Sequence, residues 1–94
     1  MPKIKVHPND PTMYMFWDVA LDRPNAFYVR NQHPSWSWNE DYECPTVSPS
    51  IRLIHTGNQV DHLFIRDGKI QYLNDCTHEL AGKTVDMVDF PEDW

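Results

Sequence analysis

The sequence predicts a mainly β fold: a small antiparallel sheet curled into a sandwich or partial barrel, with at most one short helical turn. Three observations predict this fold. Short runs of β-branched and aromatic residues alternate with turn residues, no helical period lasts longer than a turn or two, and Asp67-Gly68 separates two of the runs. The length of 94 residues fits one domain, residues 1–94, with an extended lead-in over residues 1–11 and an acidic tail over residues 90–94.

Turn residues and prolines divide the chain into the segments that we expect to be strands. A turn carrying Asp22, Pro24 and Asn25 separates the second segment from the third. Trp36 and Trp38 alternate with serines, which places both indoles on one face of a short strand. A single helical turn is expected within residues 75–82. The expected strands are residues 4–6, 12–17, 26–30, 36–38, 46–55, the two arms of a hairpin, and 84–90.

The strongest local signal is a β-hairpin over residues 60–74 that turns at Asp67-Gly68, because both turn residues must tolerate a positive φ. A two-residue turn fixes the pairing of the two strands. Counting outward from it puts His62 and Asp75 diagonally across the hairpin, within reach of each other. One face of the hairpin is apolar, and we expect it to lie in the core: Leu63, Ile65, Ile70 and Tyr72.

The charge pattern excludes some functions. The net charge is −6 and no basic patch stands out, so no nucleic-acid partner is expected. The longest apolar stretch, Met13 to Trp17, is too short to span a bilayer, and the first residues do not resemble a secretory signal. We therefore expect a cytoplasmic protein without a membrane partner. The acidic surface fits simple solubility, the binding of a basic protein or the imitation of a nucleic-acid backbone.

Several side chains are candidate metal ligands. His62, Cys76 and His78 form one conceivable zinc site, with Cys44 or Asp75 as a fourth ligand; His55 is a further histidine of the same set. The chain has no paired short spacing such as Cys-x-x-Cys, which structural zinc sites usually have. The alternative is structural: His62 bonds to the aspartate or to a backbone carbonyl, and Cys76 is a small buried side chain.

Catalytic signatures are weaker. Cys76 as a thiolate, with His62 or His78 as its base, is one interpretation, but acidic neighbours raise the pKa of a thiol. Ser48 and Ser50 fit an anion cradle or ordinary turn chemistry equally well. Nothing resembles a phosphate loop, a dinucleotide fingerprint or a paired-carboxylate hydrolase motif, so no catalytic residue is predicted.

Candidate binding residues are Trp36, Trp38 and Asp75. The two indoles either form an exposed binding surface or fill the core, and in so small a domain the core is favoured.

The motifs together resemble a known family. They are similar to the signature of a small bacterial and bacteriophage family of unknown function, whose members are often mislabelled as ammonia monooxygenase. The resemblance extends over roughly residues 36–89. The matching segments are Trp36–Asn39, Pro45–Ile51, His62 with Phe64, Asp67–Ile70 and Asp75–Val85.

The departures from that pattern concern cysteines. Family members commonly carry a Cys-Pro-x-Cys stretch near the N-terminus and a cysteine directly before the histidine of His-x-Phe, a set that resembles zinc ligands. Here Asp18 stands where a cysteine is expected after Phe16-Trp17, and Asp61 precedes His62. These departures weigh against a complete zinc site. The resemblance implies a viral or prophage origin and residence in the host cytoplasm, with no established activity.

Size, charge and the resemblance lead us to predict a phage-type protein that binds a host protein as an inhibitor or modulator. Two alternatives remain open. One is a metal- or thiol-dependent enzyme centred on His62, Asp75, Cys76 and His78, and the other is a structural or assembly protein. No cofactor other than zinc is expected, and the sequence predicts no particular oligomeric state.

Overall fold

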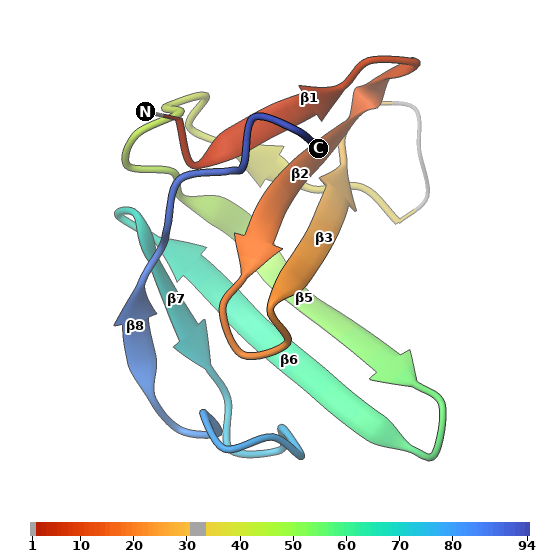
Figure 1. Cartoon of the computed structure of the whole chain (residues 1–94), viewed down its shortest axis with the longest axis vertical. Helices are drawn as coiled ribbons and strands as arrows, with labels where there is room; N and C mark the ends of the chain where they lie inside the picture. The colour runs from red at the N-terminus through yellow and green to blue at the C-terminus, as the bar shows by residue number, and fades with distance from the viewer. Residues whose placement is uncertain (1, 31–33) are drawn as a thin grey trace.

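A computed structural model describes residues 2–30 and 34–94, and of His55 the backbone alone. The described residues form eight strands in two antiparallel sheets (Figure 1) and contain no helix. The mainly β prediction is confirmed. The smaller sheet has the order β1-β2-β3 and the larger has the order β4-β5-β6-β7-β8. The strands are β1 Ile4–His7, β2 Asp10–Asp18, β3 Arg23–Tyr28, β4 Ser37–Trp38, β5 Val47–His55, β6 Gln59–Arg66, β7 Lys69–Tyr72 and β8 Thr84–Asp86.

The core consists of buried apolar residues from both sheets. Phe16 and Phe27 of the smaller sheet are fully buried, and so are Ile51 and Leu63 of the larger sheet. Large aromatic rings supply much of the apolar area that a chain of this size can bury. Figure 1 shows β2 and β3 crossing in front of β5 and β6, so each sheet covers one side of the other.

The predicted hairpin register is confirmed. Ile65 pairs with Ile70 and Leu63 pairs with Tyr72 across the Asp67-Gly68 turn, as a two-residue loop requires. These four paired residues, predicted to face the core, are each 1% exposed or less. Both turn residues have positive φ, 49° for Asp67 and 75° for Gly68.

Some predicted boundaries are corrected. Pro24 and Asn25, expected in a turn, lie inside β3, which is an edge strand and therefore tolerates a proline. Residues 75–82 form turns rather than a helical turn. The last strand ends at Asp86 instead of residue 90, because Phe90 leaves the sheet and donates its backbone N–H to Pro2 of the lead-in, 2.9 Å.

Strand β5 is irregular near its start. Val47 pairs with Ile65 and Ile51 pairs with Leu63, so the three residues from Ser48 to Ser50 lie opposite the single residue Phe64. Such bulges re-aim side chains and are common beside functional sites. On its other side, among the residues that the structure describes, β5 pairs with a strand only at Val47 and Ser48, opposite the two-residue strand β4.

No helix long and apolar enough to cross a membrane is found in residues 2–30 and 34–94.

Candidate active site

The segment after β7 docks along the edge of β6 and carries Asp75 to the hairpin. Leu73 donates its N–H to the His62 carbonyl (2.9 Å), and Thr77 donates its N–H to the Val60 carbonyl (3.0 Å). The Thr77 hydroxyl accepts the N–H of Val60 at 2.9 Å. The segment thus continues the β7 side of the ladder, with Asp75 between its two points of attachment.

His62 lies between a carboxylate and a hydroxyl. Its Nδ1 is 3.0 and 3.1 Å from the two carboxylate oxygens of Asp75, and its Nε2 is 3.0 Å from Oγ of Ser50. The predicted proximity of His62 and Asp75 is confirmed. Because a carboxylate accepts hydrogen bonds only, we assign the proton of the neutral ring to Nδ1, which leaves Nε2 to accept the hydroxyl proton of Ser50.

The electrostatics of this group favour a charged carboxylate. The hydrogen bond and the positive charge that His62 can carry lower the pKa of Asp75, and Arg52 adds to the effect with Nε at 3.9 Å from Asp75 Oδ2. The side chain of His62 is 21% exposed and that of Asp75 is 50% exposed. The imidazole is therefore sheltered while its carboxylate is in contact with solvent.

Ser50 is held in place by the bulge and by a tryptophan. Pairing of Arg52 with His62 puts Ser50 diagonally opposite the histidine on the outer face of the large sheet. The indole Nε1 of Trp36 donates to the Ser50 carbonyl at 3.1 Å, and the backbone N–H of Trp36 donates to Tyr28 at 2.7 Å. Trp36 therefore ties the serine to the smaller sheet.

A second histidine–carboxylate pair lies on the inner face of β6. His78 Nε2 donates to Asp61 Oδ1 at 2.9 Å, and His78 Nδ1 accepts the N–H of Leu80 at 3.2 Å. Asp61 is fully buried beside the equally buried Asp18. The hydroxyl of Tyr72 donates to Asp18 at 2.7 Å. Both nitrogens of His78 thus have partners within the protein.

Burial changes the protonation of this inner pair. It raises the pKa of Asp61 to about 8, with further increases from its hydrogen bond to Asp18 and from the charge of Asp18, while Arg23 acts in the opposite direction. Two adjacent buried carboxyls cannot both ionise cheaply. Asp61 therefore carries the shared proton at neutral pH.

Asp61, Cys76 and His78 form a group that could hold a metal ion, because their ligand atoms all lie within 4.8 Å of one another. Two of its members, Cys76 and His78, belong to the set predicted from the sequence. The structure places His62 elsewhere, with both ring nitrogens directed at Asp75 and Ser50.

Cys76 is a structural side chain in this arrangement. Its Sγ donates to the His62 carbonyl at 3.1 Å and accepts the N–H of the same residue at 3.2 Å. Burial raises the pKa of the thiol, which disfavours the thiolate that the Cys–His interpretation requires.

The remaining predicted residues lie away from this group. Cys44 is exposed and sits beside Gly68, at the turn end of the hairpin. Trp38 is half-buried and packs on Tyr14 and Phe27, with ring centroids 5.1 and 5.9 Å apart, so it contributes to the core. The side chain of His55 lies outside the described part of the chain.

Serine, imidazole and carboxylate in this order form the triad of the serine hydrolases, which recurs on unrelated folds. One family model matches residues 6–73, more than half of the chain, and is described as "BubE: Bacterial ubiquitination-like system serine protease". The chain belongs to this BubE family. The matched range includes Ser50 and His62 and ends just before Asp75. Comparison with the curated proteins and with the solved structures found no match.

The family match does not test the resemblance to the family of unknown function, which stays a prediction. Sequence reasoning did not include Ser50 in the site. No local signal gives its place, because the loop at residues 56–58 sets the pairing of β5 with β6, and its sequence permits more than one loop length.

Proposed function

We propose that this protein is a serine protease with Ser50 as nucleophile, His62 as general base and acid, and Asp75 as the carboxylate that orients the imidazole. The observation that carries the proposal is the continuous chain of hydrogen bonds from Ser50 Oγ through the ring of His62 to Asp75. Membership of a family described as serine proteases supports it.

The proposed reaction uses this geometry in two stages. Oγ of Ser50 attacks the scissile carbonyl carbon while His62 Nε2 takes the hydroxyl proton, which gives a tetrahedral intermediate. The imidazolium then gives this proton to the leaving amine, and an acyl-enzyme ester on Ser50 remains. Water then attacks the ester while the same nitrogen takes its proton, and this proton passes to Ser50 Oγ as the acid product leaves. Throughout, the negative Asp75 holds the ring and stabilises its positive charge.

An alkyl fluorophosphonate probe tests the proposal directly, since it phosphonylates activated serines. We expect one adduct per chain by intact-protein mass spectrometry, located on Ser50 by peptide mapping. Ser50→Ala removes the adduct. Ser48→Ala is the matched control, because Ser48 is an exposed serine two residues away that pairs with Ser37. Absence of labelling in a folded wild-type protein contradicts the proposed function.

For the metal group we propose zinc as the ion, because thiolate and imidazole ligands suit Zn²⁺. Binding would release the thiol proton of Cys76 and would move the ring proton of His78 from Nε2, which now donates to Asp61, to Nδ1, which now accepts the N–H of Leu80. Metal analysis of protein purified without chelators tests this, with Cys76→Ser as the comparison. A zinc content near zero in the wild-type protein contradicts the zinc proposal and does not affect the proposed serine chemistry.

The binding of a host protein, the phage origin and the cytoplasmic location stay predictions from the sequence. The same holds for the expected absence of nucleic-acid and membrane partners.

A further inference from the structure

The edge of β5 next to Ser50 is open in the described part of the chain. Strand β4 pairs with β5 only at Val47 and Ser48, whereas β5 continues to His55. An uncovered edge presents backbone donors and acceptors to any extended chain that lies beside it.

The register shows which backbone groups face this edge. Arg52 pairs with His62, and Ile54 pairs with Val60. The backbone groups of His62 and Val60 bond on the β7 side, to Leu73, Cys76 and Thr77. The pairs Arg52–His62 and Ile54–Val60 therefore exchange no backbone hydrogen bonds within the β5–β6 ladder. The N–H and C=O groups of Arg52 and Ile54 consequently point away from β6, toward the open edge.

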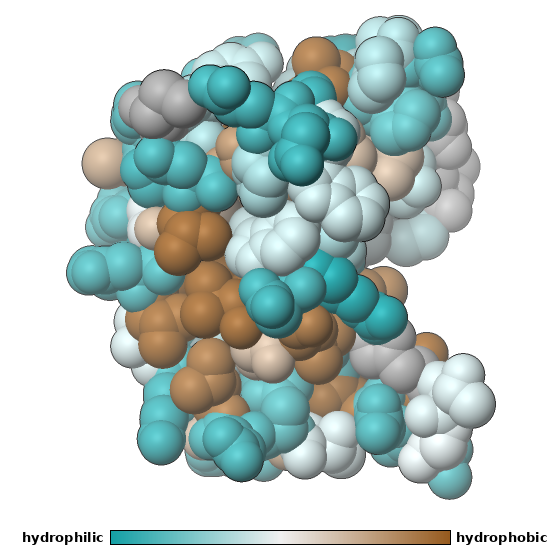
Figure 2. All heavy atoms as spheres, viewed as in Figure 1, coloured by the Kyte–Doolittle hydropathy of each residue, from teal (hydrophilic) through white to brown (hydrophobic). Residues whose placement is uncertain are grey.

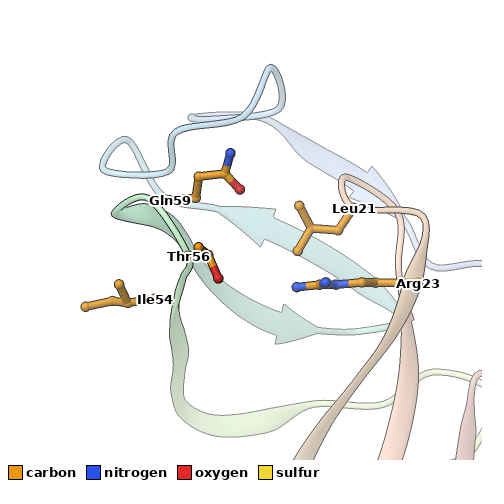
Figure 3. A pocket seen from close by; sticks show the side chains of 5 residues that line it. All are labelled: Leu21, Arg23, Ile54, Thr56 and Gln59. Carbon is orange, nitrogen blue, oxygen red and sulfur yellow. The ribbon is translucent and has the colours of Figure 1, made fainter.

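Two pockets follow this edge between β5 and β3. The first, about 310 Å³, begins at Ile51, the residue after Ser50, and is lined by Trp36, Tyr28 and residues 51–53 of β5, among others. The second, about 500 Å³, is lined by Leu21 and Arg23 on one side and by Ile54, Thr56 and Gln59 on the other (Figure 3). In Figure 2 the outline of the molecule is hollowed on the right, between the β2–β3 pair and the tip of the β5–β6 hairpin.

We propose that an extended segment of the protein substrate binds in this groove as an added β-strand, paired with Arg52 and Ile54 and directed at Ser50. The proposal rests on the proposed serine protease function. Addition of a strand to an open edge is a general mode of peptide recognition in which main-chain bonds supply affinity and pockets select alternate side chains.

The linings indicate the side chains of the substrate. The first pocket has an aromatic and aliphatic wall made by Tyr28, Trp36 and Leu53, which suits an apolar residue. Arginines stand at both pockets of a chain whose net charge is −6: Arg52 at the first and Arg23 at the second, where Figure 3 shows the guanidinium reaching toward Thr56. An acidic residue two positions from the apolar one fits the second pocket.

Peptidyl phosphonates test the groove separately from the nucleophile. The probe is an acetylated Ala-Glu-Ala-Leu diphenyl phosphonate, and its rate of labelling is divided by that of a small alkyl fluorophosphonate. Two analogues carry N-methyl groups on opposite sets of alternate amides. Because an added strand bonds through every second residue, we expect one analogue to label about ten- to thirtyfold more slowly and the other to label like the parent. Equal rates for the two analogues overturn the proposal.

A backbone variant gives the matching result on the protein side. Ile54→Pro removes the outward N–H without removing a ladder bond, and we expect the normalised peptidyl rate to fall at least about tenfold. Ile54→Val keeps the N–H and should change that ratio by less than about twofold. If Ile54→Pro changes the normalised labelling rate as little as Ile54→Val does, strand addition is contradicted.

Noncovalent binding separates failure of the groove from failure of the nucleophile. The peptide amide Ac-Ala-Glu-Ala-Leu-NH₂ is titrated to millimolar concentration into Ser50→Ala, and ¹⁵N-resolved spectra are recorded. We expect the largest amide shifts at Arg52 and Ile54. If these shifts appear while the fluorophosphonate leaves wild type unlabelled, the groove stands and the protease proposal falls. Shifts absent from this edge overturn the groove.

Discussion

Strand β6 carries two histidine–aspartate pairs on opposite faces, and their burial gives them opposite chemistry. On the outer face His62 pairs with Asp75, whose side chain is 50% exposed and whose pKa is lowered. On the inner face His78 pairs with Asp61, which is fully buried and has a pKa raised to about 8. The residue types and the distances, 3.0 and 2.9 Å, are nearly the same.

A histidine–aspartate pair alone does not define a catalytic site. The outer carboxylate is charged at neutral pH, so it can stabilise an imidazolium, and the second ring nitrogen of His62 meets a hydroxyl. The inner carboxyl is protonated, and the second ring nitrogen of His78 accepts a backbone N–H. The outer pair therefore differs from the inner pair in two ways: its carboxylate is charged, and its imidazole contacts a serine hydroxyl.

The largest effect is expected from removing the two histidines in turn. His62→Ala deletes the base, and we expect the rate of acyl transfer to fall by about 10⁴- to 10⁶-fold, as for other triads. His78→Ala should keep the activity of the folded fraction within about tenfold, because His78 touches no part of the triad. Initial rates on an activated ester, with folding checked by circular dichroism, measure both. Comparable losses in the two variants would erase the distinction between the pairs.

The carboxylates give the next largest contrast. Asp75→Asn keeps the shape but removes the charge that orients and stabilises the imidazolium, so we expect kcat to fall by about 10²- to 10⁴-fold. The lower part of this range applies if water partly replaces the exposed carboxylate. Asp61→Asn imitates the protonated acid and should leave kcat within about threefold. An Asp75→Asn variant with full activity would show that the outer pair is structural too.

The hairpin half of the site was predictable because its determinants are local. Asp67-Gly68 admits one turn length, and period-two alternation then gives the core face and the approach of His62 to Asp75 without further information. The same alternation places Asp61 on the face of Leu63, yet a buried carboxyl is not expected from its residue type. The buried carboxyl is stabilised by residues that are distant in the sequence, mainly by its hydrogen bond to Asp18.

Ser50 was not predictable for a different reason. Its approach to His62 depends on the pairing of β5 with β6, and the segment Thr-Gly-Asn-Gln permits more than one loop length. Here His55 pairs with Gln59, which brings Arg52 opposite His62. The bulge at Ser48–Ser50 then interrupts the simple alternation on which a sequence argument relies. The serine also depends on Trp36, fourteen residues earlier, whose indole bonds to its carbonyl.

The smallest expected effect is on the pH dependence of the free energy of unfolding, and it comes from the buried carboxyl of the inner pair. Asp61 has a usual pKa of 3.8 and a folded pKa of about 8, so between these values the folded protein holds a proton that the unfolded chain releases. Its contribution is complete below about pH 4 and is lost as the pH rises through 8, with a slope of at most about 1.4 kcal/mol per pH unit. Asp75, with its lowered pKa, acts in the opposite direction and only at acidic pH.

Urea unfolding from pH 5 to 8 in the presence of a chelator measures this slope. We expect wild type to lose stability as the pH rises and Asp61→Asn to have a flatter profile, because the amide of asparagine offers Asp18 a donor and His78 an acceptor at every pH. Asp75→Asn is the control and should follow wild type over this range. If Asp61→Asn and wild type have parallel profiles, the inner carboxyl is not protonated, and burial does not separate the two pairs in the way proposed.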